Sequence, residues 1–184
     1  MSSFPHLSEP LTDGQVVLRD YEERDIPEIL IAYQDDPHLH LRMGEERPPS
    51  GAELGRQAER GRADRAIGQR AWLTILEPGS DTCLGLVRVH TTDWDQSRAE
   101  MGIFLAPGMR GRGLGRAALR LAGQWLLGPC GLARVELMIE PGDAAMLASC
   151  AAAGFAREGI LREYLRQRGK RVDVVIMSLI RADV

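Results

Sequence analysis

The chain has 184 residues, of which 44% are hydrophobic and 27% charged, a composition typical of one globular domain with a core that needs no disulfide or metal. Its three widely spaced cysteines, its N-terminus without a signal-like pattern and the lack of any run near the roughly 18 apolar residues of a membrane span argue against disulfide-rich, metal-bound and membrane classes. A net charge of −3 without a basic and aromatic stripe argues against nucleic-acid binding, so we expect a single cytoplasmic domain over residues 1–184 with neither membrane nor nucleic-acid partner.

The first half of the sequence predicts one strand, two helices and a three-strand meander. Residues 15–21 are strand-like, and Asp25 is expected to cap the helix that follows. The apolar residues of that helix share one face: Ile26, Ile29, Leu30 and Tyr33. Ser50 and Glu53 match a capping box that opens a charged helix reaching about Ala66. Three nearly continuous apolar strands joined by short turns follow, over 70–77, 82–90 and 98–106.

The second half alternates helices and strands. Apolar residues at helical spacing run from Leu114 until Gly128 and Pro129 end the helix. Residues 133–140 alternate as a strand, and the small-residue helix after them closes at Gly154. The last elements, 155–165 and 170–180, form a hairpin around Arg168, Gly169 and Lys170. This order predicts a mixed α/β sheet in one domain.

The stretch LAPGMRGRGLGRAAL joins the third strand of the meander to a helix. It contains four glycines and three arginines: Gly108, Gly111, Gly113 and Gly115, with Arg110, Arg112 and Arg116. The first amide groups of a helix have no intrahelical partner, and glycines let an anion approach the main chain closely. The loop is therefore expected to bind phosphate groups, the alternative being a tight turn with solvated arginines.

Three phosphate-binding patterns compete for this loop. The Walker A pattern needs a lysine, and none is near. A dinucleotide fingerprint with Gly113, Gly115 and Ala118 is a weak match, because the strand ends some six residues earlier and the acidic Glu136 lies inside the next strand. The pattern Arg/Gln-x-x-Gly-x-Gly/Ala is satisfied in full by residues 110–115.

This loop resembles the acetyl-CoA loop of the GNAT acetyltransferase superfamily. The resemblance runs from VVLRDYEERDIPEI to the final hairpin. Within the superfamily, the chain is most similar to the RimJ/RimL-like ribosomal-protein N-terminal acetyltransferases, in which the segment EPGDAAMLASCAAAGFAREGILRE has a counterpart. It implies a single-domain α/β fold, GNAT-like, with a mixed, mostly antiparallel, splayed sheet and flanking helices. It also implies an N-acetyltransferase that uses acetyl-CoA as co-substrate without a metal, the amine attacking directly in a ternary complex.

The resemblance assigns roles to individual residues. The pantetheine arm of CoA would bond to the backbone near Phe104 and Leu105 like an added strand, and the pyrophosphate would lie on the amides of 110–115. The residues implied for CoA binding are Phe104, Leu105, Arg110, Gly111, Arg112, Gly113, Leu114, Gly115, Arg116 and Asp143. Glu100 would be the general base, the alternative being a strand-end carboxylate that faces solvent or pairs with Arg98 or Arg134.

The proton donor to the CoA thiolate is open because the sequence departs from the family here. Where RimL-like members have Asn-x-x-Ser, this chain has Asp143 and Met146. Asp143 can cap its helix and bond pantetheine, but a carboxylate does not donate as an amide does, and Met146 cannot relay a proton. Ser149 and Tyr164 are the candidate donors, with water as the alternative, and Cys150 is expected in the core. His90, after a strand, could be a second base.

The acceptor is expected to be a primary amine: a protein or peptide N-terminus, a lysine or a small cationic amine. Residues 1–50 hold eleven acidic and four basic side chains, and in the family the first helix and the loop after it frame the acceptor groove. The acidic residues there are Glu22, Glu23, Glu28, Asp35, Asp36, Glu45 and Glu46. An acidic entrance would attract a cation, although such charge often serves solubility alone. An acyl-CoA-binding sensor with little turnover is the alternative function, a nucleotide-dependent oxidoreductase fits less well, and a homodimer is possible.

Overall fold

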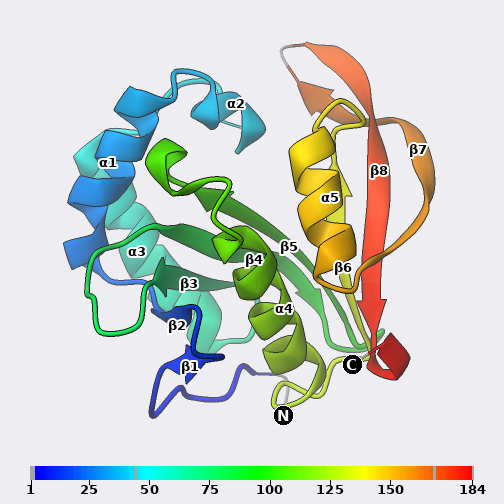
Figure 1. Ribbon diagram of the computed structural model, residues 1–184, viewed down its shortest axis with the longest axis horizontal. Helices are drawn as coiled ribbons and strands as arrows, with labels where there is room; N and C mark the ends of the chain where they lie inside the picture. Colours follow the sequence, from blue (N-terminus) through cyan, green and yellow to red (C-terminus); the bar gives the residue numbers. More distant parts are fainter. Residues whose placement is uncertain (1–2, 44, 168, 184) are drawn as a thin grey trace.

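Within residues 3–43, 45–167 and 169–183, which the computed structural model describes, eight strands form one sheet in the order β1-β2-β3-β4-β5-β6-β8-β7 (Figure 1). The strands are β1 (Leu11–Thr12), β2 (Val17–Asp20), β3 (Ala71–Leu76), β4 (Gly85–Asp93), β5 (Arg98–Leu105), β6 (Arg134–Ile139), β7 (Ala156–Gln167) and β8 (Lys170–Ile180). Neighbouring strands are antiparallel except β5 and β6, which are parallel. The expected mixed, mostly antiparallel α/β sheet is confirmed.

Helices cover both faces of this sheet. They are α1 (Ile26–Asp35), α2 (Leu39–Arg42), α3 (Gly51–Ala66), α4 (Leu114–Leu127) and α5 (Ala144–Ala152), with 3-10 turns at Glu23–Asp25, Pro107–Met109 and Arg181–Asp183. One face packs on α4 and α5, and the other on α1 and α3 (Figure 1). The predicted order of elements holds, with the two-residue β1 and the one-turn α2 added. Arg168, which the sequence predicts in the turn of the last hairpin, lies outside the described residues.

The two faces carry separate cores, because successive side chains of a strand point to opposite sides. On β5, Ala99 and Met101 join the larger core with α4, whereas Phe104 joins the smaller core with Tyr33 of α1. Burial on both faces explains why the meander strands read as nearly continuous apolar runs. Glu100 and Gly102 alternate with the residues of the larger core, so they lie on the α1 and α3 face.

The two predicted caps differ in outcome. The Ser50 and Glu53 capping box is confirmed: Glu53 N donates to Ser50 Oγ at 3.3 Å, and Ser50 N donates to Glu53 Oε2 at 2.8 Å. The prediction that Asp25 caps α1 is wrong, since its carboxylate makes no bond to that helix start. Helix α1 instead follows a 3-10 turn and has proline in its first turn, which removes one donor in need of a cap.

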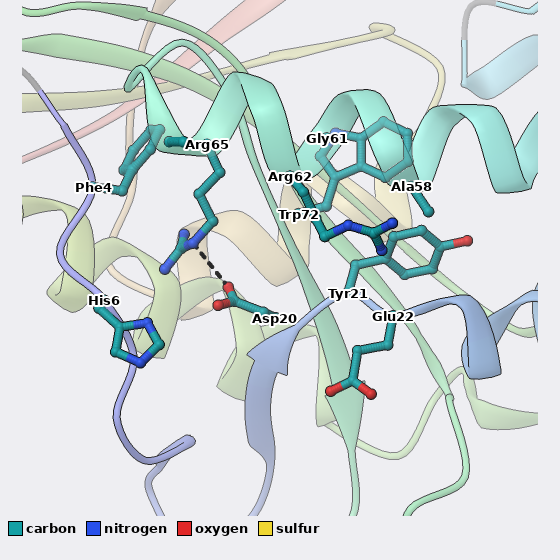
Figure 2. Close-up of a pocket in the computed structure, with 11 residues that line it drawn as sticks. Phe4, His6, Asp20, Tyr21, Glu22, Ala58, Gly61, Arg62, Arg65 and Trp72 are labelled. Carbon is teal, nitrogen blue, oxygen red and sulfur yellow. Dashed lines mark ion pairs between the residues drawn. The ribbon is translucent and has the colours of Figure 1, made fainter.

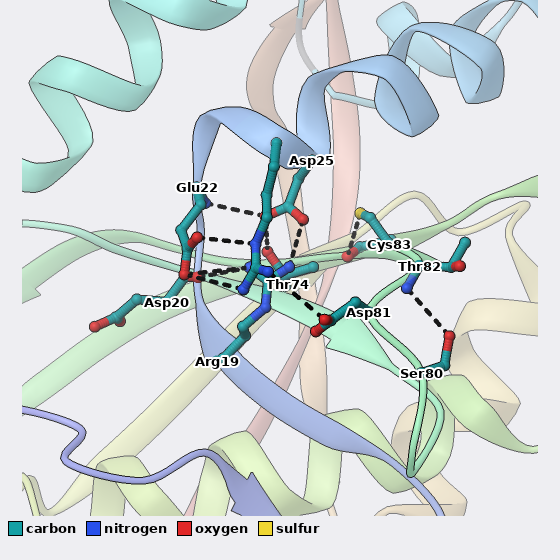
Figure 3. A network of polar contacts seen from close by, with 11 residues as sticks. Arg19, Asp20, Glu22, Asp25, Thr74, Ser80, Asp81, Thr82 and Cys83 are labelled. Atoms are coloured by element: carbon teal, nitrogen blue, oxygen red, sulfur yellow. Dashed lines mark hydrogen bonds and ion pairs between the residues drawn. The ribbon is translucent and has the colours of Figure 1, made fainter.

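The Asp25 carboxylate is buried and holds three segments together (Figure 3). It accepts two hydrogen bonds from the Arg19 guanidinium, at 2.7 and 2.9 Å, one from Thr74 Oγ1 at 2.7 Å and one from Glu22 N at 3.0 Å. A bidentate, charge-assisted pair of this kind is stronger than a single helix cap. The network therefore joins β2, the turn before α1 and β3 beneath the first helix.

The parallel ladder between β5 and β6 is short. It contains three pairs, of which Glu100 opposite Glu136 is the last among the described residues. Beyond that pair β5 continues to Leu105 beside β4, while β6 pairs with β8 up to Ile139. The two strands diverge (Figure 1), so the splayed sheet predicted from the sequence is confirmed.

Candidate active site

The glycine-rich loop connects the diverging end of β5 to α4. Gly111 and Gly113 have φ values of +75° and +80°, which side-chain-bearing residues resist, and a Cβ at either would meet no atom within 4 Å. Gly113 is the residue before the first turn of α4, whose sequence contains no acidic residue there. The first amides of α4 thus open onto space suited to an anion. Gly115 lies within α4, where a Cβ would touch Leu105 at 3.5 Å.

Two of the loop arginines are paired with carboxylates from elsewhere in the chain. Arg110 donates through Nε to the Leu105 carbonyl at 3.1 Å and through Nη2 to Asp36 at 2.7 Å. Arg112 donates to Glu77 at 2.5 Å. The Arg110 side chain therefore lies toward the end of α1, which differs from the simple expectation that all three arginines present charge to a phosphate.

The edge of β5 past the ladder has no partner strand among the described residues, although the Leu105 carbonyl there accepts the bond from Arg110. Phe104 and Leu105 pair with Leu86 and Gly85 of β4, but the strand pairings of the described residues give them no partner on the β6 side. Their side chains fix the strand: Phe104 faces Tyr33 with ring centroids 6.4 Å apart, and Leu105 packs into the larger core. An extended ligand arm could hydrogen-bond along this edge as an added strand does.

Glu100 lies where the two strands part. It is half-buried and directly opposite Glu136. Burial, and after it the negative charge of Glu136, raises the pKa of Glu100. A carboxylate with a raised pKa is closer to the working range of a general base.

The two arginines that the sequence suggested as ion-pair partners of Glu100 pair with other carboxylates instead. Arg134 pairs with Glu136 and with Glu158, which also accepts a bond from Ser178 at 2.7 Å. Arg98 is 3.7 Å from Asp93. Among the described residues no ion pair ties up Glu100, so its carboxylate remains available for chemistry.

The candidate proton donors lie on separate elements. Asp143 caps α5 as expected, with its Oδ1 accepting from Met146 N at 3.0 Å. The Ser149 hydroxyl donates to the Ala145 carbonyl at 2.9 Å, and Tyr164 is 48% exposed on the outer strand β7. Cys150 is buried, as expected, and burial raises the pKa of its thiol to about 12. No hydrogen bond between Glu100 and either donor occurs in the part of the chain that the structure describes.

Sequence reasoning missed a buried arginine on the α1 and α3 face. Arg88 is 5% exposed, lies 4.8 Å from the centroid of Trp72 and 5.7 Å from that of Phe104, and has Nη1 3.6 Å from Glu45. Glu45 also accepts a 2.7 Å bond from Tyr33. Its place inside an otherwise apolar strand is the sequence feature from which Arg88 could have been identified.

The acidic residues that the sequence places near the acceptor groove are partly neutralised by ion pairs. Asp36 pairs with Arg42 and Arg110, and Glu45 faces Arg88. Glu22 and Glu23 also form ion pairs with arginines, so four of the seven acidic residues expected near the acceptor are already engaged. Their charge serves internal pairing rather than an open acidic entrance. This reduces the support for electrostatic attraction of a cationic acceptor.

A cavity of about 380 Å³ lies away from the loop, between α3, β2 and the N-terminal segment (Figure 2). Phe4, Tyr21 and Trp72 give it aromatic walls, and Asp20 and Arg65 approach at 3.1 Å across it. None of the residues that the sequence assigned to catalysis or CoA binding lines this cavity. It is therefore separate from the candidate active site.

Residues 3–43, 45–167 and 169–183 contain no group of three or more His, Cys, Asp or Glu side chains able to hold a metal ion. In the same residues no helix has the length and apolar character needed to cross a membrane.

Comparison with known proteins gives consistent matches. A family model described as an acetyltransferase (GNAT) domain matches residues 15–156. The chain is 25% identical to a Bacillus licheniformis protein named uncharacterized N-acetyltransferase p20, over 95% of this chain and 98% of that one. Mycobacterium smegmatis RimJ in complex with CoA-disulfide has a TM-score of 0.82 at 21% identity, covering 96% of this chain and 88% of that one. Vibrio cholerae spermidine N-acetyltransferase, in complex with CoA and spermine, has a TM-score of 0.80 at 21% identity, covering 93% and 98%.

Proposed function

The chain belongs to the GNAT acetyltransferase family, and from that premise we propose that it transfers an acetyl group from acetyl-CoA to a primary amine by direct attack in a ternary complex. The observation that carries the proposal is the order of three features along β5 toward α4. The strand parts from β6 at Glu100, whose carboxylate has no ion pair among the described residues; its edge then lacks a partner strand; and the glycine loop before α4 follows. A thioester held where the strands part would lie beside both a base and main-chain donors.

CoA binding would use mainly the backbone. The pantetheine arm would extend along the free edge of β5 at Phe104 and Leu105, and the pyrophosphate would lie on the amides of 110–115. Arg116, on the first turn of α4, would add positive charge, and Asp143 would border the arm from the start of α5. Two solved structures of similar fold are complexes with CoA-disulfide and with CoA, which supports CoA as a ligand of this fold.

The chemistry would begin with removal of a proton from the acceptor ammonium by Glu100, directly or through water. The neutral amine then attacks the thioester carbonyl, whose oxygen is stabilised by a main-chain N–H of β5. Collapse of the tetrahedral intermediate breaks the C–S bond and leaves a thiolate that must gain a proton. Ser149 and Tyr164 are the donors proposed from the sequence.

The acceptor class that we propose is a primary amine: a protein or peptide N-terminus, a lysine or a small cationic amine. The names of the similar proteins include RimJ and a spermidine N-acetyltransferase, so these relatives differ in what they modify. An amine is the feature that N-acetylation requires, because the nitrogen lone pair that attacks the thioester is free only in the neutral amine.

A thiol-release assay tests the proposal. The protein is incubated with acetyl-CoA or succinyl-CoA and a panel of amines, peptides with free N-termini among them, while CoA affinity is measured by calorimetry. We expect CoA binding and amine-dependent thiol release. Binding without release for every amine would favour the alternative, an acyl-CoA-binding sensor, and absence of CoA binding would contradict both.

A further inference from the structure

His90 is the extra residue of a bulge between β4 and β5. The pairing runs Val89 with Met101 and then Thr91 with Glu100, so His90 has no partner of its own. A bulge of this kind redirects a side chain that would otherwise follow the regular alternation of the strand. The bulge lies immediately beside Glu100, at the end of the parallel ladder.

The His90 imidazole occupies the space that a side chain at residue 102 would need. A Cβ on Gly102 would lie 2.7 Å from His90 Nε2, closer than any real contact. Residues 100, 102 and 104 of β5 point to the same face, so the imidazole lies over β5 between Glu100 and Phe104. Glycine at 102 is thus what allows the ring to reach the strand that borders the proposed thioester.

The charges around the imidazole favour its neutral form. Burial, followed by the positive charges of Arg88 on β4 and Arg70 before β3, lowers the pKa of His90 to about 4. Glu100 is the carboxylate on the adjacent strand. At neutral pH the ring can accept a proton, and the imidazolium so formed is a far stronger acid than a thiol, whose pKa is about 8.5.

We propose that His90 carries a proton from the acceptor nitrogen to the departing sulfur of CoA. The inference rests on the proposed function and supplies the donor that the Asp143 and Met146 departures left missing. Ser149 donates to its own helix, and Tyr164 lies on the exposed outer strand, whereas His90 lies beside Glu100.

Two protons leave the amine in each turnover. Glu100 takes the first from the ammonium, and the lone pair of the amine then forms the N–C bond with the thioester carbonyl. His90 Nε2 takes the second from the nitrogen of the tetrahedral intermediate. The C–S bond breaks with its electron pair on sulfur, which receives the proton from His90, so that amide and CoA thiol are released and the imidazole is neutral again. Glu100 returns its proton to solvent.

Two substitutions test this by different means. His90→Gln removes the titrating ring, whereas Gly102→Ala leaves His90 intact but displaces its imidazole with the new Cβ. We expect each to lower kcat by about 10²-fold or more, with the Kd for CoA within about twofold of wild type. Gly159→Ala is the matched control, since a Cβ there meets nothing within 4 Å, and its kcat should be unchanged.

Two further measurements separate proton transfer from a structural role. In a His90→Ala background, Gly102→Ala should change kcat by less than about twofold, because the imidazole that lies nearest to the new Cβ is absent. Added imidazole should restore activity to His90→Ala, and pyrazole, a ring of the same size but far weaker as a base, should not.

The inference is overturned if His90→Gln keeps kcat within about twofold of wild type, if Gly102→Ala costs as much without His90 as with it, or if pyrazole rescues as well as imidazole. Should His90→Gln fail to fold, Gly102→Ala still decides. A wild-type protein that releases no thiol overturns the proposed function and this inference together, whereas full activity in His90→Gln overturns the inference alone.

Discussion

Arg110 and Asp36 form an ion pair, with Nη2 2.7 Å from Oδ2, that joins the loop before α4 to the end of α1. Asp36 is buried and also accepts a bond from His38 N at 3.1 Å and pairs with Arg42. Although burial opposes it, the bond from Arg110 and the charge of Arg42 lower the pKa of Asp36. The first arginine of the loop is thus coupled to the segment that leads into α2.

This pair predicts that Asp36→Asn affects the acceptor more than CoA. Loss of the pair frees the α1–α2 segment, so we expect the acceptor KM to rise several-fold while the CoA Kd changes by less than about threefold. Arg110→Ala should behave alike. Arg112→Ala, which loses the bonds to Glu77 and to the Met109 sulfur but none to α1, is the control for acceptor KM. Equal weakening of CoA and acceptor by Asp36→Asn would contradict the prediction.

Gly113→Glu should weaken CoA binding by more than about tenfold, because the side chain enters the space before α4 and adds like charge beside the phosphates. The change also strains a residue with φ of +80°. Gly79→Glu is a matched control, because Gly79 has φ of +79° and equally open surroundings in another turn. Calorimetric titration with CoA should separate the two variants, and similar affinities would argue against a phosphate site here.

Glu100→Gln should lower kcat by about 10²–10⁴-fold near neutral pH and leave CoA affinity intact, since it removes the basic oxygen but keeps the shape. Part of the rate should return toward about pH 9.5, where more of the amine is already neutral. A pH profile of kcat, with CoA titration in parallel, provides the check. Wild-type rates at the acid end of the profile would remove Glu100 from the role of base.

Glu136→Gln should shift the acid limb of the wild-type profile. Burial and the charge of Glu136 raise the pKa of Glu100, and a base is active only when deprotonated, so activity is lost as pH falls through that raised pKa. Removing the Glu136 charge removes one raising cause, and the limb should move to lower pH. An unmoved limb in kcat against pH would show that another group controls it.

Asp25→Asn should destabilise the fold by about 3–5 kcal/mol, because it removes the buried, bidentate carboxylate partner of Arg19 and leaves only the exposed Glu22 at 3.9 Å. Urea unfolding followed by circular dichroism measures the change. Asp81→Asn, whose carboxylate is 79% exposed and 3.7 Å from Arg24, should leave the midpoint nearly unchanged. Similar midpoints for the two variants would contradict the importance of the buried network.

Features formed by neighbouring residues could be predicted from the sequence, whereas hydrogen-bond and ion-pair partners far apart in the chain could not. The Ser50 and Glu53 cap was predictable because both groups belong to one helical turn. Asp25 was mistaken for a cap because Thr74, 49 residues away, cannot be identified from local spacing. Glycine at 111 and 113 is typical of positive φ. The ion pair between Arg110 and Asp36 could not be predicted, because it depends on how α1 packs.

The candidate site shows the same division. Glu100 was identified by its motif, whereas its pairing with Glu136 depends on strand register. His90 stood out only as a histidine after a strand. Its position over Gly102 follows from a one-residue slip in register, which hydrophobic alternation does not specify at a polar position.

With CoA bound as proposed, the three-pair ladder between β5 and β6 would also link the stability of this protein to metabolism. A ligand arm that completes the free edge of β5 binds only the folded chain, so its binding free energy adds to the free energy of unfolding. At a ligand concentration 100 times Kd the gain is about 2.7 kcal/mol, a large part of the margin of an ordinary domain. Thermal unfolding should therefore shift upward with CoA concentration, and the lifetime of the protein in a cell should follow the size of the CoA pool.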